Sequence, residues 1–189
     1  MKNQKIQICL KVFFIILIFL LLIFFVYGFI IEENSAGAGG FKGDFSNVWL
    51  TLQTFLNADT LTAIKSSAKA LPGQEVNYIS SRTPLIYILN KFLNPFTDSI
   101  TNYIRSIFYF SLLAPLLFYY CLKIKFPKIN NIILIFLAST ILLSPYFRTS
   151  AYWGLEENFG IVFVLISYLL LHQFFKEKKI EILFKFIKL

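Results

Sequence analysis

The sequence predicts an all-α, polytopic membrane protein with about four transmembrane helices and a helical exoplasmic loop between the first two. Three observations lead to this fold class. The 189 residues are 57% hydrophobic and only 15% charged, and their mean hydropathy is +0.68, which is unlike an ordinary soluble domain. Long apolar runs without acidic or basic residues recur along the chain. Basic residues cluster beside those runs rather than on a separate polar face.

The first predicted span, residues 12–31, contains only Leu, Ile, Phe and Val apart from Tyr27 and Gly28. Twenty helical residues, at about 1.5 Å each, cross a hydrocarbon core of about 30 Å. A cleaved signal peptide is the alternative, but this run is longer than the apolar region of such peptides, and two glutamates follow it. Three further uncharged runs are predicted spans, residues 106–122, 132–146 and 159–175.

The distribution of charge predicts the orientation. Lys2, Lys5 and Lys11 precede the first span without any acid, so the positive-inside rule places the N-terminus in the cytoplasm. Four alternating spans then put eleven of the eighteen basic residues on that side, with two of the ten acids. Topology thus accounts for the net charge of +8 without a nucleic-acid partner. In a bacterium this would be an inner (plasma) membrane protein, with residues 176–189 forming a cytoplasmic tail or the start of another span.

The exoplasmic segment, residues 32–105, is predicted to contain three amphipathic helices, because apolar residues recur there at helical spacing. Asp44 and Asp59 are the expected N-caps of the first two, and the third follows Pro84. Asp98 is the expected N-cap ahead of the second span. These helices either lie along the membrane surface or form a small soluble cap. The predicted helices cover residues 45–56, 59–71 and 85–92.

Several classes of function are excluded or disfavoured. The predicted spans carry no Asp, Glu, Lys or Arg, which argues against an ion or proton transporter. Cys9 and Cys121 both lie near the predicted cytoplasmic side, so they offer no disulfide framework or zinc motif. No serine-hydrolase or nucleotide-binding motif is present. What remains is the exoplasmic face, where all three arginines lie. Guanidinium groups there either grip a phosphate bidentately or snorkel to lipid head groups.

Four segments together resemble a known family. They are Glu33-Asn34-Ser35-Ala36-Gly37, the glycine-containing residues 39–45, Ser81-Arg82-Thr83-Pro84-Leu85, and the short outer loop from Ser144 to Trp153. This arrangement is similar to the N-terminal portion, or to a short member, of the GT-C type membrane glycosyltransferases, which include the dolichyl-phosphate-mannose mannosyltransferases. Members of that superfamily typically have eight or more spans, whereas four are predicted here.

The resemblance implies a function and its site. The chain would transfer a sugar from a polyprenyl-phosphate carrier to an acceptor on the exoplasmic face. Asp44 is the first choice for the acidic group that acts as base or metal ligand, and Glu33 is the second. Arg82 and Arg148 would hold the carrier phosphate. A divalent metal is the one cofactor that this family suggests. The alternative is a non-catalytic membrane subunit or assembly factor, in a complex whose partner supplies the missing helices.

Overall fold

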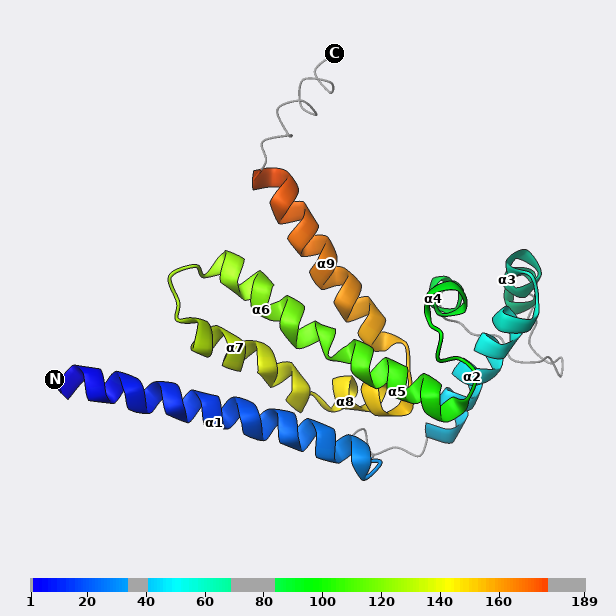
Figure 1. Cartoon of the computed structure of the whole chain (residues 1–189). Helices are drawn as coiled ribbons and strands as arrows, with labels where there is room; N and C mark the ends of the chain where they lie inside the picture. The colour runs from blue at the N-terminus through cyan, green and yellow to red at the C-terminus, as the bar shows by residue number, and fades with distance from the viewer. Residues whose placement is uncertain (1, 34–40, 69–83, 177–189) are drawn as a thin grey trace, which may run out of the picture. The chain divides into compact units, whose positions relative to one another are not determined.

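The computed structural model describes residues 2–33, 41–68 and 84–176, and all regular structure within these ranges is helical (Figure 1). The predicted all-α class is therefore confirmed. In chain order the helices are α1 Lys2–Ile30, α2 Phe41–Asn57, α3 Thr60–Ala68, α4 Leu85–Leu93, α5 Ile100–Ser111, α6 Leu113–Lys125, α7 Asn131–Ser139, the 3₁₀ helix η1 Thr140–Leu143, α8 Pro145–Trp153 and α9 Glu157–Lys176.

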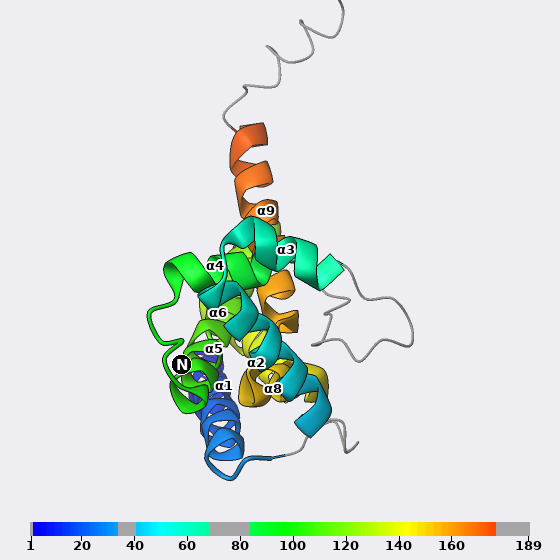
Figure 2. The ribbon, with the colours of Figure 1, turned by 90° about the vertical axis from the view of Figure 1, so that its right-hand side faces the viewer.

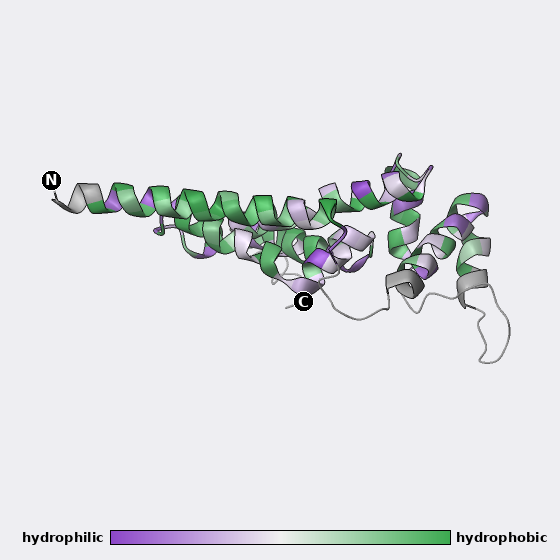
Figure 3. Cartoon of the chain, turned by 90° about the horizontal axis from the view of Figure 1, so that it is seen from below, coloured by the Kyte–Doolittle hydropathy of each residue, from purple (hydrophilic) through white to green (hydrophobic). Residues whose placement is uncertain are grey.

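Within the described ranges, three helical stretches are long and apolar enough to cross a bilayer, namely Ile6–Ile30, Ile100–Lys125 and Glu157–Phe175. A fourth crossing is added if the broken pair Asn131–Leu143 and Pro145–Trp153 forms one span. In Figure 3, α1 is hydrophobic along most of its length, with hydrophilic residues towards its N-terminal end, and such a long apolar stretch is typical of a helix that is surrounded by lipid or by other apolar helices. The chain is thus a polytopic integral membrane protein, as the sequence predicts.

Two prolines explain where the helices break. Pro115 has no N–H to donate to the carbonyl of Ser111, and α5 gives way to α6 at Leu112. Pro145 occupies the first position of α8, where an N–H is not needed, and the Ser144 hydroxyl caps this helix by accepting the N–H of Phe147 at 3.4 Å. The segment from Ser144 to Trp153 is consequently a helix, and its prediction as a loop was wrong.

The predicted span 132–146 is not one continuous helix either. It comprises α7, η1 and the first residues of α8. The break between η1 and α8 lies at Ser144, which is the N-cap of α8.

The chain divides into two compact units. The first comprises residues 1–25, 112–143 and 160–189. Its centre is the α6–α7 hairpin with the adjoining η1, where Leu134 and Ala138 of α7 and Leu142 of η1 are buried. Phe14 of α1 packs on Phe136 of α7, with ring centroids 5.2 Å apart.

The second unit comprises residues 26–111 and 144–159. Aromatic pairs join its helices. Phe55 of α2 stacks on Tyr87 of α4 at 5.4 Å, and Phe29 at the end of α1 stacks on Phe108 of α5 at 4.0 Å. Figure 2 shows α2, α3 and α4 together in this unit. The buried, one-sided apolar stripe of α2 is formed by Phe45, Val48, Leu52 and Phe55, the spacing from which the helix was predicted.

The predicted helix starts were tested by their caps. Asp59 caps α3, since its Oδ1 accepts the N–H of Thr62 at 3.0 Å, as predicted. Asp44 is not an N-cap, because α2 begins at Phe41 and Asp44 is its fourth residue. Asp98 is not the cap of α5 either. The hydroxyl of Ser99 accepts the N–H of Asn102 at 3.3 Å, whereas the Asp98 carboxylate accepts the side-chain amide of the same asparagine.

The third predicted helix is observed as α4, which ends at Leu93 before Asn94. The predicted end of the second helix, at residue 71, lies outside the described residues, which stop at position 68 on that side of the gap.

Candidate functional site

Within the second unit, the C-terminal end of α1 is shaped to direct Glu33. The Glu33 N–H donates to the carbonyl of Gly28 at 2.9 Å, and the Glu32 N–H donates to that of Phe29 at 3.2 Å. Glu32 itself has a φ of +53°. These bonds form a Schellman motif, in which the left-handed position usually belongs to glycine. A side chain in this conformation costs about 1–2 kcal/mol, and the motif leaves Glu33 just beyond the helix end.

Helix α8 supplies the other half of the site. The guanidinium of Arg148 forms an ion pair with Glu33 through Nη2 and Oε2, although the two residues are 115 positions apart in the chain. The Arg148 Nε donates to the hydroxyl of Tyr152 at 3.1 Å. The guanidinium also lies 5.7 Å from the centroid of the same ring, within cation–π range. Arginine and tyrosine meet because residues i and i+4 share one face of a helix.

The two charged side chains differ in access to solvent. The side chain of Arg148 is 6% exposed and that of Glu33 is 30% exposed. A buried guanidinium is costly unless it is paired and hydrogen-bonded, so Glu33 and Tyr152 stabilise it in this position. The carboxylate is the member of the pair that another molecule can reach.

Gly28 allows these groups to come together. A Cβ added to it would lie 2.5 Å from the Glu33 Oε2, 2.7 Å from the Arg148 Nη2 and 2.7 Å from the Tyr152 hydroxyl. No ordinary side chain fits against these atoms without displacing them. The side-chain ends of Glu33, Arg148 and Tyr152 therefore lie directly against the backbone of Gly28.

A second polar network holds α8 in place. Asn158 is fully buried, and its amide donates to the Ser111 hydroxyl at 2.8 Å and to the carbonyl of Phe147 at 3.0 Å. The Ser150 hydroxyl donates to the Glu157 carboxylate at 3.1 Å and accepts the backbone N–H of Asn158 at 3.3 Å. These bonds tie α8 to α5 and to the first turn of α9, so Arg148 is presented from a rigid element.

Gly154 ends α8 with a φ of +67°. A Cβ here would lie 3.1 Å from Ile104, 3.3 Å from Phe45 and 3.4 Å from Tyr103. The backbone of Gly154 thus lies directly against the α2 and α5 side chains of the same unit.

Two of the four site residues that the sequence predicts are adjacent in the structure, namely Glu33 and Arg148. Asp44 lies within α2, and its side chain is outside the described part of the chain, as is the whole of Arg82. Among the described residues, no group of three or more His, Cys, Asp or Glu side chains could hold a metal ion.

Sequence reasoning missed Tyr152 and Gly28. For both residues the sequence contains a pattern that could have indicated their role. Tyr152 lies four residues after Arg148, which is the spacing of neighbours on a helix. Gly28 interrupts an otherwise bulky apolar run, and an isolated glycine in a helix often marks a close approach. The first signal was hidden because the segment was interpreted as a loop.

Comparisons with known proteins give no relative. No protein-family model matches the chain, and searches of curated proteins and of solved structures find no significant match.

Proposed function

We propose that this integral membrane protein is a glycosyltransferase, or the N-terminal part of one, which takes a sugar from a polyprenyl-phosphate carrier. The observation that carries the proposal is the ion pair between Glu33 and Arg148. It brings together two residues to which the family resemblance assigns the two complementary roles, acid and phosphate ligand.

The chemistry of glycosyl transfer needs both groups. A carboxylate accepts the proton of the attacking hydroxyl, and general base catalysis of this kind contributes about 10²–10⁴-fold. A cation stabilises the charge on the departing phosphate. Glu33 is the more exposed partner and is suited to meet an acceptor, whereas the planar guanidinium of Arg148 is suited to a phosphate. Asp44 and Arg82 complete the proposed site on the resemblance alone.

In this structure both acceptors of Arg148 come from its own chain, so a carrier phosphate has to displace one of them. Arg148 donates to Glu33 and to Tyr152, so a carrier phosphate that binds Arg148 has to compete with one of these acceptors. Because Glu33 is partly exposed and Tyr152 is 5% exposed, the carboxylate is the partner that moves. Its release next to the bound donor would place the base beside the sugar.

The second candidate, a non-catalytic membrane subunit, is favoured by the burial of the same pair. A guanidinium that is 6% exposed and paired within its own chain serves equally well as a clamp between α1 and α8. In that case the pair stabilises the fold and binds no ligand.

A binding experiment on the purified full chain in bilayer nanodiscs separates the two functions. The probe is a fluorescent polyprenyl phosphate, with the matching polyprenol as the neutral competitor. We expect the chain to prefer the phosphate, and Arg148→Lys to weaken its binding about tenfold or more, since a lysine cannot make the bidentate contact. Arg105→Lys is the matched control, because Arg105 is exposed and lies in α5.

The acid is tested by transfer rather than binding. Glu33→Gln keeps the shape of the side chain and should retain carrier binding while abolishing glycan transfer in cells that express the chain. Glu32→Gln, at the neighbouring exposed acid, should leave both unchanged. A chain that binds polyprenol as tightly as polyprenyl phosphate refutes the proposal. Unchanged glycan profiles in Glu33→Gln and Arg148→Lys would leave the subunit function in its place.

A further inference from the structure

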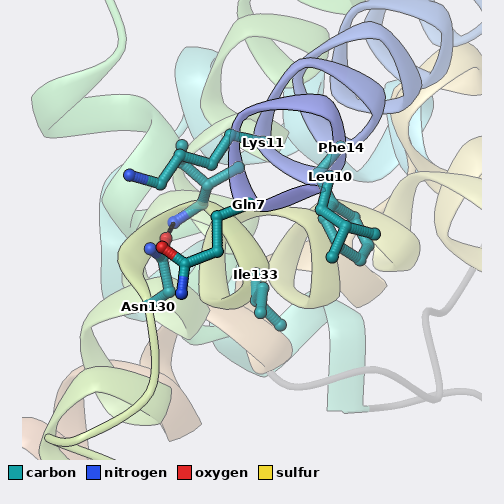
Figure 4. Close-up of a pocket in the computed structure, with 7 residues that line it drawn as sticks. Gln7, Leu10, Lys11, Phe14, Asn130 and Ile133 are labelled. Atoms are coloured by element: carbon teal, nitrogen blue, oxygen red, sulfur yellow. Dashed lines mark hydrogen bonds between the residues drawn. The ribbon is translucent and has the colours of Figure 1, made fainter. Parts of the chain in front are cut away.

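The first unit contains a hollow of about 260 Å³ between the N-terminal part of α1 and the start of α7. One side of its lining is polar and the other is apolar. Figure 4 shows Lys11 and Asn130 with their polar groups on one side, and Leu10 and Phe14 on the other. The remaining lining residues are Gln7, Ile132 and Ile133.

The charge around this hollow is entirely positive. No acidic residue occurs in the described parts of the first unit, residues 2–25, 112–143 and 160–176. Three lysines precede Asn130, namely Lys123 and Lys125 in the last turn of α6 and Lys128 in the turn that follows. One of them is engaged locally, since the Lys123 ammonium donates to the side chain of Asn131, the first residue of α7, at 2.6 Å. Lys11 is the cation that lines the hollow.

The surrounding surface is suited to hydrocarbon. Beyond Lys11, α1 exposes large apolar side chains, among them Val12, Phe13 and Ile16, each more than 50% exposed. A hollow of this size is smaller than the about 300–1,000 Å³ of pockets that enclose a drug-sized molecule. It therefore holds only part of a ligand whose remainder lies along the apolar helices.

We propose that this hollow between α1 and α7 binds an anionic phospholipid, with the head-group phosphate on Lys11 and Asn130 and an acyl chain beside Leu10, Phe14 and Ile133. The Lys11 ammonium attracts an anionic lipid head group that lies in the hollow beside it. A zwitterionic lipid gains little from this charge. The inference is independent of the proposed glycosyltransferase site, which lies in the other unit.

The test uses the full chain in phosphatidylcholine nanodiscs that contain a minor fraction of photoactivatable phosphatidylglycerol. The crosslinked peptides are mapped after irradiation. We expect crosslinks in residues 7–14 and 130–133 that unlabelled phosphatidylglycerol displaces. Phosphatidylcholine and inorganic phosphate should not displace them. Displacement by phosphatidylcholine at the same mole fraction overturns the proposal, and displacement by inorganic phosphate shows a bare anion site instead of a lipid site.

Two matched pairs of variants define the site. Lys11→Gln should lower the apparent affinity for phosphatidylglycerol about fivefold, the effect expected of one lysine near an anionic lipid. Lys128→Gln, an exposed lysine outside the lining, should change it less than twofold. Ile133→Trp fills the hollow without changing charge and should also remove the crosslinks, whereas Ile135→Trp on the same helix should retain them. Equal losses within either pair contradict the proposal.

Discussion

Replacing Gly154 by alanine tests whether the end of α8 is packed as the structure describes. The φ of +67° places this residue in the left-handed region, where a Cβ costs about 1–2 kcal/mol. The new methyl group would also lie 3.1 Å from Ile104 and 3.3 Å from Phe45. Overpacking of this kind costs about 1–3 kcal/mol. Together the two effects predict that Gly154→Ala lowers the free energy of unfolding by about 2–5 kcal/mol.

Gly160→Ala is the matched control, with an expected effect of the opposite sign. Gly160 lies in the first turns of α9, and a Cβ added there meets nothing within 4 Å. Alanine is favoured over glycine inside a helix by about 0.8–1.0 kcal/mol. The two variants should therefore differ by about 3–6 kcal/mol in the same chain. Denaturant titration in detergent micelles, followed by circular dichroism, measures the difference. If both variants have the same stability, the assigned packing of Gly154 is refuted.

Three further predictions concern other parts of the chain. Gly28→Ala should displace the Glu33–Arg148 pair without altering any charge, and the free energy of unfolding should fall; a wild-type stability would contradict the close approach. The pKa of Asp59 is lowered by its hydrogen bonds with Thr62, so its cap is fully effective above the unfolded pKa. The cap is lost as pH falls through the lowered value. The protection of the α3 amides against hydrogen exchange, taken relative to their intrinsic exchange rates, should therefore fall at acid pH in the wild type, whereas Asp59→Asn should show no such dependence. Single cysteines at positions 60 and 125, in a cysteine-free background, should be labelled from opposite sides of the membrane, and labelling of both from one side would overturn the predicted orientation.

The helices themselves could be predicted well from local pattern. The spacing of Phe45, Val48 and Leu52 predicted α2, and Asp59 marked the start of α3. Starts were predicted less well where two polar residues competed. Asp98 and Ser99 are adjacent, and only the structure shows that the serine is the cap of α5. Either side chain can accept an N–H, so the choice depends on the backbone geometry that the rest of the fold imposes.

The candidate site was predicted in part, for a similar reason. Glu33 was selected because it follows a span and Arg148 because guanidinium groups bind phosphate, but nothing in the sequence relates two residues that are 115 positions apart. Tyr152 and Gly28 remained unrecognised because their roles depend on that pairing. The interpretation of Ser144 to Trp153 as a loop failed because Ser144 and Pro145, which interrupt one helix, also begin the next.

The sequence by itself determined that the chain is a helical membrane protein. Uncharged apolar runs of this length partition into the bilayer, and there they have to satisfy every backbone hydrogen bond internally, as a helix does. The tertiary structure alone decided which polar groups meet. The Asn158 amide donates to the Ser111 hydroxyl, and Arg148 forms an ion pair with Glu33, only because the packing of the helices brings these residues together. A buried polar group must find a partner wherever the fold puts it, and that partner can come from any part of the chain.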